Sequence, residues 1–325
     1  MAKERPDFRK DPVGNLRYHA GGVKAYIDGP ASRRKTMRTQ WKLGFAERYV
    51  SPVIAVDEGD IRYFVDTSDT GPITVGLVGE KRWDEPLMER TLELITKLLD
   101  RPEPLKDRVF LDVGGNIGTA TLCALKRFDA GRAVAFEPEP KNFKFLKLNI
   151  VANDLELQAL PVQVAISDQP GELLLEIAPE NVGDHRIRSG NETGGGDLGE
   201  NNRETVRVEA LTLDGALERT QVAKDDVGLI WIDVQGHEPQ VLAGGADTLA
   251  SGAPVLLEYW PYGLKRAGGL EAMHEQLRAH FSEAWEVGEE RDDGPPTRVD
   301  LDALETLAER FVHPYDSTNL LLLKR

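Results

Sequence analysis

Short apolar runs alternate with helix-like segments from residue 105 to the end of the sequence. An uninterrupted apolar run predicts a strand buried on both faces, and apolar residues at helical spacing predict a helix that covers the sheet. This alternation is typical of an α/β domain with a mostly parallel sheet and helices on both faces. The predicted strands are 109–113, 132–137, 161–166, 172–177, 205–211, 228–233, 254–259, 284–288 and 318–323, and the predicted helices are 117–128, 139–152, 212–220, 238–250, 270–280 and 300–310.

The preceding part of the chain has a different pattern. Residues 1–48 are polar and basic with scattered aromatics, and we expect loose or partner-dependent structure there. The breaker Arg101-Pro102-Glu103-Pro104 separates this part from the main domain. The sequence therefore predicts a small α+β extension over 1–100 and a main domain over 105–325. Within the extension, the predicted elements are strands at 53–56, 61–65 and 73–78 and an amphipathic helix at 84–99.

The most informative feature is the glycine-rich turn after the first strand of the main domain. Asp112 ends the apolar run, and the turn 113–118 (Val-Gly-Gly-Asn-Ile-Gly) leads into a predicted helix. Glycine lets the backbone turn sharply and approach a ligand closely. Glu137 ends the next predicted strand, 23 residues after Gly114, where nucleotide-binding folds place the carboxylate that binds a ribose diol. This pattern predicts a site for an adenosine-containing cofactor.

The charge of the turn distinguishes between two cofactors. A dinucleotide fingerprint has glycine where Val113 stands, and it presents a helix N-terminus to the pyrophosphate. The carboxylate of Asp112 would repel those phosphates. S-adenosylmethionine has no phosphate and carries a sulfonium and an ammonium group, which an acid attracts. The sequence therefore predicts S-adenosylmethionine rather than NAD, with a ligand-free structural turn as a further alternative.

Four predicted strands end in, or next to, an acidic residue. Strand ends on one edge of a parallel sheet converge, so we expect these acids to ring one cleft. A single acid after a strand is usually a helix cap, and any member of the set can serve as one. Four in succession indicate a binding site. They are Asp112, Glu137, Asp233 and Glu258, and Asp168 follows a fifth strand.

Two regions supply candidates for acid–base chemistry. Asp233 is expected to face the cleft, where it positions the acceptor or accepts its proton. His237 has a side chain suited to general-base catalysis, and a capping or surface histidine is an equal alternative. Residues 178–204 form a polar, glycine-rich loop that is long for a compact domain. His185 in this loop is a further base candidate and Arg186 a candidate contact of the acceptor, with a solvated loop as the alternative.

Five elements in order make the chain similar to FkbM-family methyltransferases, a branch of the Rossmann-like S-adenosylmethionine enzymes. The match covers about residues 105–260. The elements are Asp112 to Gly118, Phe136-Glu137-Pro138 with Asn142 to Asn149, Ala165-Ile166-Ser167-Asp168 with Gly171, Leu213-Asp214, and Asp233 to Glu238 with Val241 to Ala246.

The resemblance implies a class I methyltransferase fold with a mostly parallel seven-stranded sheet, and transfer of a methyl group to a hydroxyl of a sugar, polyketide or related metabolite. Clustered carboxylates can hold magnesium, but no dedicated ligand spacing stands out, so no metal is predicted. The cofactor-binding residues that the motifs imply are Asp112, Gly114, Gly115, Asn116, Gly118, Glu137, Pro138, Ala165, Asp168 and Asp233.

Two positions depart from the family pattern. Trp231 stands where a lysine is common, and Gln235 replaces the first glutamate of the central motif. The cofactor site should be unaffected by these changes. The substrate chemistry that the family implies becomes less certain.

The charge and composition of the chain limit the classes of partner that it is expected to bind. The chain of 325 residues has a formal net charge of −15, but its first 50 residues carry 12 Lys and Arg against 5 Asp and Glu, so the remainder carries −22. This acidic charge argues against binding of nucleic acid, because a protein surface that binds nucleic acid usually carries a basic stripe. The single cysteine, Cys123, cannot form an intramolecular disulfide, and no apolar run is long enough to span a membrane. We expect a cytoplasmic protein without membrane or nucleic-acid partners.

Other functions remain open at the level of sequence. A methyltransferase acting on protein or RNA would keep the cofactor, although the charge disfavours RNA and no Asn-Pro-Pro-Tyr segment is present. An NAD-dependent sugar-modifying oxidoreductase would need the glycine that Val113 replaces. A non-enzymatic adaptor would dock through the basic N-terminal arm. The oligomeric state is also open, a homodimer included.

Overall fold

The computed structural model of the chain describes residues 30–79, 83–179, 181–188, 190, 198, 200, 203–289 and 294–324. The chain forms two compact units. The smaller comprises Met1–Trp83 with Pro179–Gly183, and the larger comprises Asp84–Ala178 with Asp184–Arg325. Residues 1–29 of the segment predicted to be loose lie outside the described part.

In its described part, from residue 30 onward, the smaller unit combines two helices with a two-stranded sheet. Strands β1 (Val53–Glu58) and β2 (Ile61–Asp66) pair antiparallel across the predicted turn. Helix α2 (Pro30–Tyr49) packs against α3 (Pro72–Gly79), and α3 contacts β1. Alternate residues of β2 are buried, as expected for a strand with one face on a core.

Two predictions for this unit are wrong. Residues 30–48, expected to be loose, lie in α2, where Leu43 is fully buried. Segment 73–78, predicted as a strand, is helix α3. Proline is favourable at a helix start, where Pro72 stands, and Gly76 leaves room for Trp83, since a Cβ there would lie 2.5 Å from the indole ring. Packing outweighs the strand propensity of its β-branched residues.

An eight-stranded sheet forms the centre of the larger unit, in the order β13-β12-β14-β11-β10-β3-β4-β5. The five neighbours from β11 to β5 are parallel, and β14 and β13 run antiparallel to their neighbours. The predicted Rossmann-like α/β fold is confirmed, with the three-residue edge strand β13 added to the seven expected strands. The bounds are β3 Val109–Val113, β4 Arg132–Phe136, β5 Ala159–Val162, β10 Val227–Ile232, β11 Val255–Tyr259, β12 Glu283–Glu286, β13 Thr297–Val299 and β14 Thr318–Leu323.

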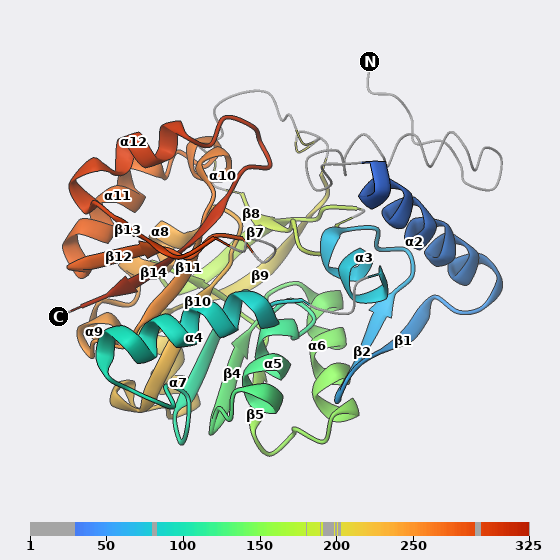
Figure 1. The fold of residues 1–325 in the computed structure, drawn as a ribbon, viewed down its shortest axis with the longest axis horizontal. Helices are drawn as coiled ribbons and strands as arrows, with labels where there is room; N and C mark the ends of the chain where they lie inside the picture. Colours follow the sequence, from blue (N-terminus) through green and yellow to red (C-terminus); the bar gives the residue numbers. More distant parts are fainter. Residues whose placement is uncertain are drawn as a thin grey trace. The chain divides into compact units, whose positions relative to one another are not determined.

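Helices cover both faces of this sheet (Figure 1). Helix α5 packs on β3 and β4, α6 packs on β5, and α4 packs on α5. On the opposite face, one core cluster joins apolar residues of the central strands to α7, α8, α9, α11 and α12. The bounds are α4 Glu85–Leu99, α5 Thr119–Arg127, α6 Pro140–Ala152, α7 Leu213–Thr220, α8 Glu238–Ala243, α9 Ala246–Ala250, α10 Pro261–Arg266, α11 Leu270–His280 and α12 Leu304–Glu309, with short 3₁₀ turns η3 Lys224–Asp226 and η4 Leu301–Ala303.

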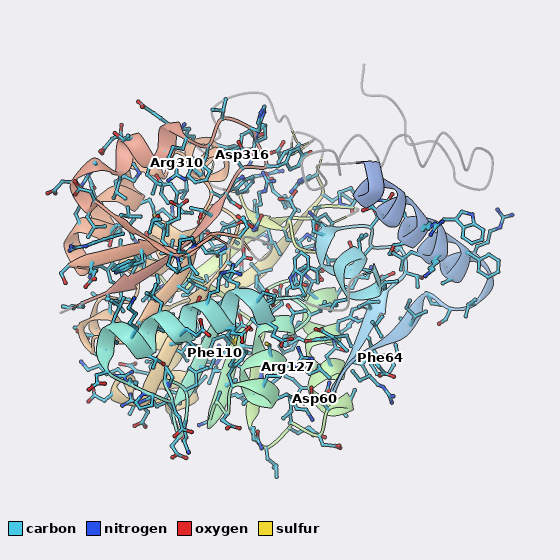
Figure 2. The ribbon with its side chains drawn as sticks, viewed as in Figure 1. Asp60, Phe64, Phe110, Arg127, Arg310 and Asp316 are labelled. Carbon is cyan, nitrogen blue, oxygen red and sulfur yellow. The ribbon has the colours of Figure 1, made fainter. Side chains whose placement is uncertain are left out.

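Burial on both faces explains why these strands appear as uninterrupted apolar runs. In β3, Leu111 packs in the core cluster, whereas the adjacent Phe110 lies on the other face and meets the ring of Trp231 at 6.2 Å (Figure 2). Arg127 at the end of α5 forms an ion pair with Glu85 of α4 (Figure 2). Helix α4 therefore belongs to the larger unit, although the sequence assigns it to the extension. The division into domains at residues 100–105 stays a prediction.

A second sheet of four strands has the order β6-β9-β7-β8. The single strand predicted at 161–166 is divided between the two sheets, since β5 ends at Val162 and β6 begins at Ala165. Strand β8 lies within the segment predicted as a loop. The bounds are β6 Ala165–Ser167, β7 Gly171–Glu176, β8 Arg186–Ile187 and β9 Thr205–Thr212.

The helix predicted at 238–250 is broken into α8 and α9 by Gly244 and Gly245. A Cβ on Gly244 would lie 2.1 Å from the carbonyl oxygen of Ser167, so the close approach of α8 to β6 requires glycine. The helix predicted at 300–310 is likewise divided into η4 and α12. Helix α10, which begins at Pro261, was not predicted because its few residues give no clear helical period.

The chain order places a topological switch between β3 and β10. From β3 the chain adds β4 and β5 on one side, and it later adds β11 on the far side of β10. Ligands of open α/β sheets bind at the carboxyl ends of strands next to such a switch. Here Asp233 N donates to Val113 O at 2.9 Å, and a Cβ on Gly114 would lie 1.9 Å from Asp233 O. Glycine at 114 therefore allows the two strand ends to meet.

We expect Gly114→Ala to destabilise the fold by more than the matched change Gly252→Ala. Both glycines have positive φ, 94° and 80°, so backbone strain should lower the unfolding free energy of both variants by about 1–2 kcal/mol. Only the first meets a backbone atom, because nothing lies within 4 Å of a Cβ on Gly252. The difference in unfolding free energy, measured with urea, should exceed about 1 kcal/mol. Equal losses would show that β3 and β10 can separate at no cost.

Candidate active site

The four acids expected at the strand ends are neighbours in the structure. Val113, next to Asp112, pairs with Ile232 before Asp233 and with Phe136 before Glu137, and Gln235 Nε2 donates to both Asp233 and Glu258. Burial is the largest cause of the raised pKa values of these acids, and the charges of neighbouring acids add to it. Asp112, Glu137, Asp233 and Glu258 thus form one acidic group at the carboxyl ends of β3, β4, β10 and β11.

The glycine-rich turn takes its shape from its backbone contacts. The amides of Gly114 and Gly115 both donate to Phe136 O at 3.0 Å, which fixes the turn against the end of β4. A Cβ on Gly115 would lie 3.1 Å from that of Ala135, and one on Gly118 would lie 2.8 Å from Leu146. These glycines therefore allow close packing of the turn against β4 and α6.

Glu137 holds this turn through its carboxylate. Its Oε2 accepts from Asn116 N at 2.8 Å, and its Oε1 accepts from Glu139 N at 2.7 Å, across the half-buried Pro138 that separates Glu137 from Glu139. Burial raises the pKa of Glu137 to about 8, although both hydrogen bonds oppose that shift. A carboxylate oxygen has two lone pairs, so each oxygen can accept one more donor. The geometry thus suits a pair of hydroxyl groups.

Asp112 is buried beneath the turn, and its Oδ2 accepts a hydrogen bond from Thr121 Oγ1 at 2.5 Å. Burial, together with the charges of the nearby Asp84 and Asp233, raises the pKa of Asp112 to about 7. A cation placed beside this carboxyl would favour its charged form. Asp112 is therefore poised to respond to the charge of a ligand.

Asp233 and Glu258 are joined by one side chain. Gln235 Nε2 donates to Asp233 Oδ1 at 2.7 Å and to Glu258 Oε2 at 2.8 Å. The side chain of Asp233 is accessible to water but is surrounded by protein at the sheet edge, and this desolvation raises its pKa to about 6. Burial, followed by the charge of Asp233, raises the pKa of Glu258 well above its usual value. Asp233 is thus the accessible member of a linked pair of acids.

Glu238 braces the turn that carries Gln235. Its carboxylate accepts from Val234 N at 3.1 Å and from Gly236 N at 3.0 Å. The side chain is fully buried at the start of α8, and burial raises its pKa to about 7. Glu238 therefore fixes the backbone of the turn and does not face the acidic group's open side.

His237 lies in a separate contact with Ser167 and Asp168. Ser167 Oγ donates to Asp168 Oδ1 at 3.1 Å and lies 2.9 Å from His237 Nε2, which assigns the ring's proton to that nitrogen. Burial lowers the pKa of His237 to about 4, so the ring is neutral and a weak base. The preceding Ala165 is buried in β6. Asp168 is thus placed with His237 rather than with the four acids.

His185 is held by the backbone. Its Nδ1 accepts a hydrogen bond from Ala178 N at 3.0 Å, which fixes the neutral ring with its proton on Nε2. Burial lowers its pKa, while the charges of Glu139 and Asp184 oppose this shift. In this state the ring presents a donor, so it can bind an oxygen but has no lone pair to take a proton.

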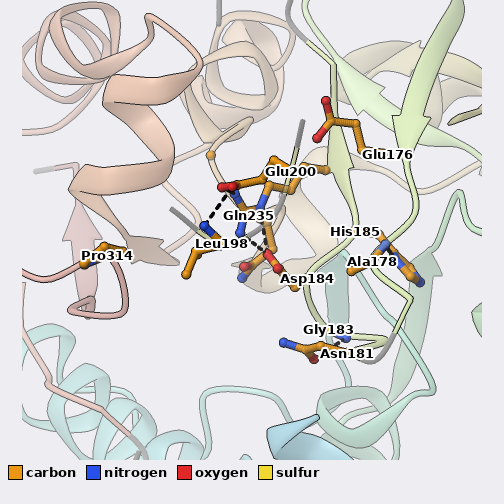
Figure 3. Close-up of polar contacts among 12 residues, drawn as sticks. Glu176, Ala178, Asn181, Gly183, Asp184, His185, Leu198, Glu200, Gln235 and Pro314 are labelled. Carbon is orange, nitrogen blue, oxygen red and sulfur yellow. Dashed lines mark hydrogen bonds and ion pairs between the residues drawn. The ribbon is translucent and has the colours of Figure 1, made fainter. Parts of the chain in front are cut away.

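An ion network fastens the segment that carries His185 (Figure 3). Arg186 is only 3% exposed; its Nη1 contacts Glu200 at 2.7 Å, and its Nε donates to Asp184 at 2.6 Å. Arg203 donates to the carbonyl oxygen of Asp184 at 2.6 Å. Tyr262 OH donates to Glu200 Oε1 at 3.0 Å, which links the segment to α10. Because its charges are paired, Arg186 is part of the scaffold in this structure.

A second buried acid extends this network. Glu176 of β7 pairs with Arg188 at 3.0 Å and with Arg266 of α10 at 3.4 Å. The guanidinium of Arg186 also lies 4.4 Å from the ring centre of Trp260, directly after β11. Breaking one partner of such a buried pair typically costs about 3–5 kcal/mol. The β7–β8 hairpin is therefore firmly attached beside the carboxyl end of β11.

Sequence reasoning missed several residues that shape the acidic group. Asp84 reads as a helix cap because it precedes α4, yet it has positive φ (60°), makes no side-chain cap bond and acts on Asp112 and Asp233. Thr121 lies in the first turn of α5, and its sequence context gives no sign of its bond to Asp112. Gln235 was visible only as a departure from the family pattern. Its two contacts could not be foreseen from sequence.

The described residues offer neither a cluster of metal ligands nor a helix that could cross a membrane. No group of three or more His, Cys, Asp and Glu side chains there is arranged to hold a metal ion. Among the same residues, no helix has the length and apolar character needed to cross a membrane.

Comparison with curated proteins finds two related methyltransferases. The "Hexuronic acid methyltransferase AglP" of Haloferax volcanii is 29% identical over 168 residues, which cover 51% of this chain and 61% of that protein. The "2-O-methyltransferase NoeI" of Sinorhizobium fredii is 29% identical over 174 residues, 51% of this chain and 67% of that protein. The chain thus spans about three fifths to two thirds of these relatives.

Solved structures with a similar arrangement include the "Methyltransferase FkbM" of Methylobacillus flagellatus KT, with 11% identity and a TM-score of 0.39 over 98% of this chain and 72% of that one. Another is TYW2 of P. horikoshii in complex with MeSAdo, with 12% identity and a TM-score of 0.36 over 84% and 72% of the two chains.

The family described as "Methyltransferase FkbM domain" matches residues 112–287, from the acid at the end of β3 to the residue after β12. This range contains Glu137, Asp233 and Glu258, and it covers more than half of the chain. The resemblance inferred from the motifs is confirmed, and the chain belongs to the FkbM methyltransferase family.

Proposed function

We propose that this chain transfers a methyl group from S-adenosylmethionine to a hydroxyl of a small-molecule acceptor. The observation that carries the proposal is the pair of buried carboxyls at the glycine-rich turn, Asp112 and Glu137. Buried acids disfavour a pyrophosphate and favour a cationic ligand without phosphate. The absence of membrane and nucleic-acid partners and a cytoplasmic location remain predictions.

The residues present fit this cofactor. Glu137 has one open lone pair on each oxygen and would bind the two ribose hydroxyls. Asp112 would lie toward the positively charged groups, and the turn from Gly114 to Gly118 would border the cofactor as its backbone passes between β3 and α5. Ala165 and Asp168 remain proposed cofactor contacts on the strength of the family motif alone.

A sugar is the acceptor class that the relatives support. One is named for hexuronic acid and the other for methylation at a 2-hydroxyl. An exposed acid at the end of β10 suits such an acceptor, because carboxylates bind hydroxyl donors well. We extend this acceptor class to the present chain as a proposal.

When bound, the cofactor supplies an electrophilic methyl group, so that a new carbon–oxygen bond forms as the carbon–sulfur bond breaks and its electron pair stays on sulfur. Alignment of the acceptor oxygen accounts for much of the rate in such a displacement. The hydroxyl proton must leave as the oxygen becomes bonded. Asp233 is accessible and has a pKa of about 6, close to the ideal for a base near neutral pH.

This geometry favours Asp233 over the two histidines as proton acceptor. Nδ1 of His185 is occupied by Ala178 N, and His237 has a pKa of about 4. His185 can instead donate through Nε2 to an acceptor oxygen. We therefore assign proton removal to Asp233 and acceptor orientation to His185.

Glu137→Ala should weaken binding of S-adenosylmethionine by about 1–3 kcal/mol, the cost of losing two hydrogen bonds to the ribose of about 0.5–1.5 kcal/mol each. Isothermal calorimetry of the folded variant measures this loss, and NAD serves as the ligand expected not to bind. Glu209→Ala is the matched control, because Glu209 is exposed on β9 and pairs with Arg219. Unchanged affinity in a folded Glu137 variant would remove this residue from the cofactor site.

Affinity for S-adenosylmethionine relative to S-adenosylhomocysteine should rise by up to about tenfold between pH 6 and 8. The free protein holds a proton on Asp112 below a pKa of about 7, and a sulfonium favours the charged carboxylate, so binding releases that proton. The thioether product lacks the sulfonium charge.

The variant Asp112→Asn should abolish the pH dependence of this ratio, whereas Glu137, whose pKa of about 8 bears on both ligands, does not change it. Titrations of both ligands at several pH values test the expectation. A ratio that stays constant in the parent protein would contradict the charge-based role of Asp112.

Asp233→Asn should lower kcat/KM by about 10²–10⁴-fold, the typical range for loss of a general base. In the parent enzyme, activity should rise with pH through about 6 as Asp233 ionises, and this limb should vanish in the variant. His185→Ala should reduce activity but retain the limb. Loss of the limb in the His185 variant instead would identify the histidine as the base.

A further inference from the structure

Gln235 has a constrained backbone and a committed side chain. Its φ of 56° is rare for a residue with a Cβ, and the carboxylate of Glu238 holds the amides on both sides of it. Both hydrogens of its Nε2 are used, one by Asp233 and one by Glu258. The side chain is therefore fixed in position and in orientation.

The orientation of the carboxamide follows from charge. If the group were reversed, its carbonyl oxygen would face Asp233 Oδ1 at 2.7 Å, which is repulsive above a pKa of about 6, where Asp233 is ionised. Nε2 therefore faces the acids and Oε1 faces away. Within the described part of the chain, Oε1 has no hydrogen-bond partner, and it is not among the polar atoms sealed from water. An accessible, uncharged acceptor thus stands beside Asp233.

The charges around this position explain why an amide stands there. Besides burial, the charges of Asp84 and Glu289 raise the pKa of Asp233. Besides burial, the charges of Asp233 and Glu238 raise the pKa of Glu258. A glutamate at 235, as in the family motif, would add another acid to this group and could not donate to either neighbour when ionised. The amide joins the two acids and leaves an acceptor that carries no charge.

We propose that Gln235 determines acceptor specificity: its Oε1 accepts a hydrogen bond from a second hydroxyl of the acceptor, next to the hydroxyl that Asp233 binds. Two adjacent acceptor atoms, one on each residue, match two adjacent donors. The acceptor class is therefore a vicinal diol, as found in sugars. This inference rests on the proposed function.

The test uses the full chain, S-adenosylmethionine and a panel of hexose and hexuronic acid methyl glycosides. Formation of S-adenosylhomocysteine identifies the best substrate, which is then compared with its analogue lacking the hydroxyl next to the methylated one. The parent enzyme should prefer the diol by up to about tenfold in kcat/KM, the upper end of what one hydrogen bond contributes.

Two variants remove the contact in different ways. Gln235→Glu keeps the shape but adds charge, and Gln235→Asn keeps the amide and tolerates positive φ but is too short to reach both acids. In each, the preference for the diol should fall to about twofold or less, mainly through KM, while affinity for S-adenosylmethionine stays within about threefold. Gln221→Glu is the matched control, because Gln221 is exposed with φ 55° and caps α7.

The possible outcomes distinguish failure of the proposed methyl transfer from failure of the role assigned to Gln235. Absence of binding by S-adenosylmethionine, or of product from every glycoside, would overturn the proposed function and this inference with it. Product formed without discrimination between the diol and its deoxy analogue in the parent enzyme would overturn the inference alone. Undiminished discrimination in both folded Gln235 variants would do the same.

Discussion

The meeting of two strand ends, β3 and β10, is the constraint on which the site depends. Asp233 N donates to Val113 O, and the carbonyl of Asp233 occupies the space that a side chain at position 114 would need. Burial is the main cause of the raised pKa of both Asp112 and Asp233, and the charge of Asp233 adds to the shift of Asp112. Without this contact the two carboxyls would not share one end of the sheet.

Bringing these acids together is electrostatically unfavourable, and the fold offsets this repulsion with hydrogen bonds from amide groups rather than with cations. Glu137, Asp233 and Glu238 accept hydrogen bonds from backbone or side-chain amides, and these bonds oppose the effect of burial on their pKa values. By contrast, the segment from Asp184 to Arg203 pairs acids directly with guanidinium groups. One region thus retains carboxyl groups whose charged form a cationic ligand can favour, while the other is internally neutralised and serves as scaffold.

Much of the larger unit could be predicted because its strands are buried on both faces. Strands 109–113 and 318–323 and helix 270–280 have the predicted bounds, since continuous apolar runs and helical periodicity record burial directly. The errors arise where distant residues decide the local structure. Trp83 beside Gly76 favours a helix where β-branched residues favour a strand, and the approach of Ser167 to Gly244 breaks a helix that has no local reason to end.

At the site, too, the sequence predicts what local patterns record and misses what distant residues decide. The positions of Asp112, Glu137, Asp233 and Glu258 follow from the rule that ligands meet the carboxyl ends of parallel strands. The protonation states and hydrogen-bond partners of these groups do not follow from the sequence. Thr121 and Gln235 bond to the acids, and Ala178 occupies Nδ1 of His185, through contacts that only the assembled fold creates. Sequence indicates which groups are present, and packing determines which of them can give or take a proton.

The pairing of Asp184 with Arg203 has a consequence for how such an enzyme can diversify. These two residues join the beginning and the end of the segment, so the position of His185 is set by that closure and by the β7–β8 pairing. The entropy of closing a loop grows only slowly with its length. Changes in the length of the segment that keep the Asp184–Arg203 pair and the contacts of Glu200 should therefore leave the histidine in place, so that the length of this segment can evolve while the position of His185 is kept.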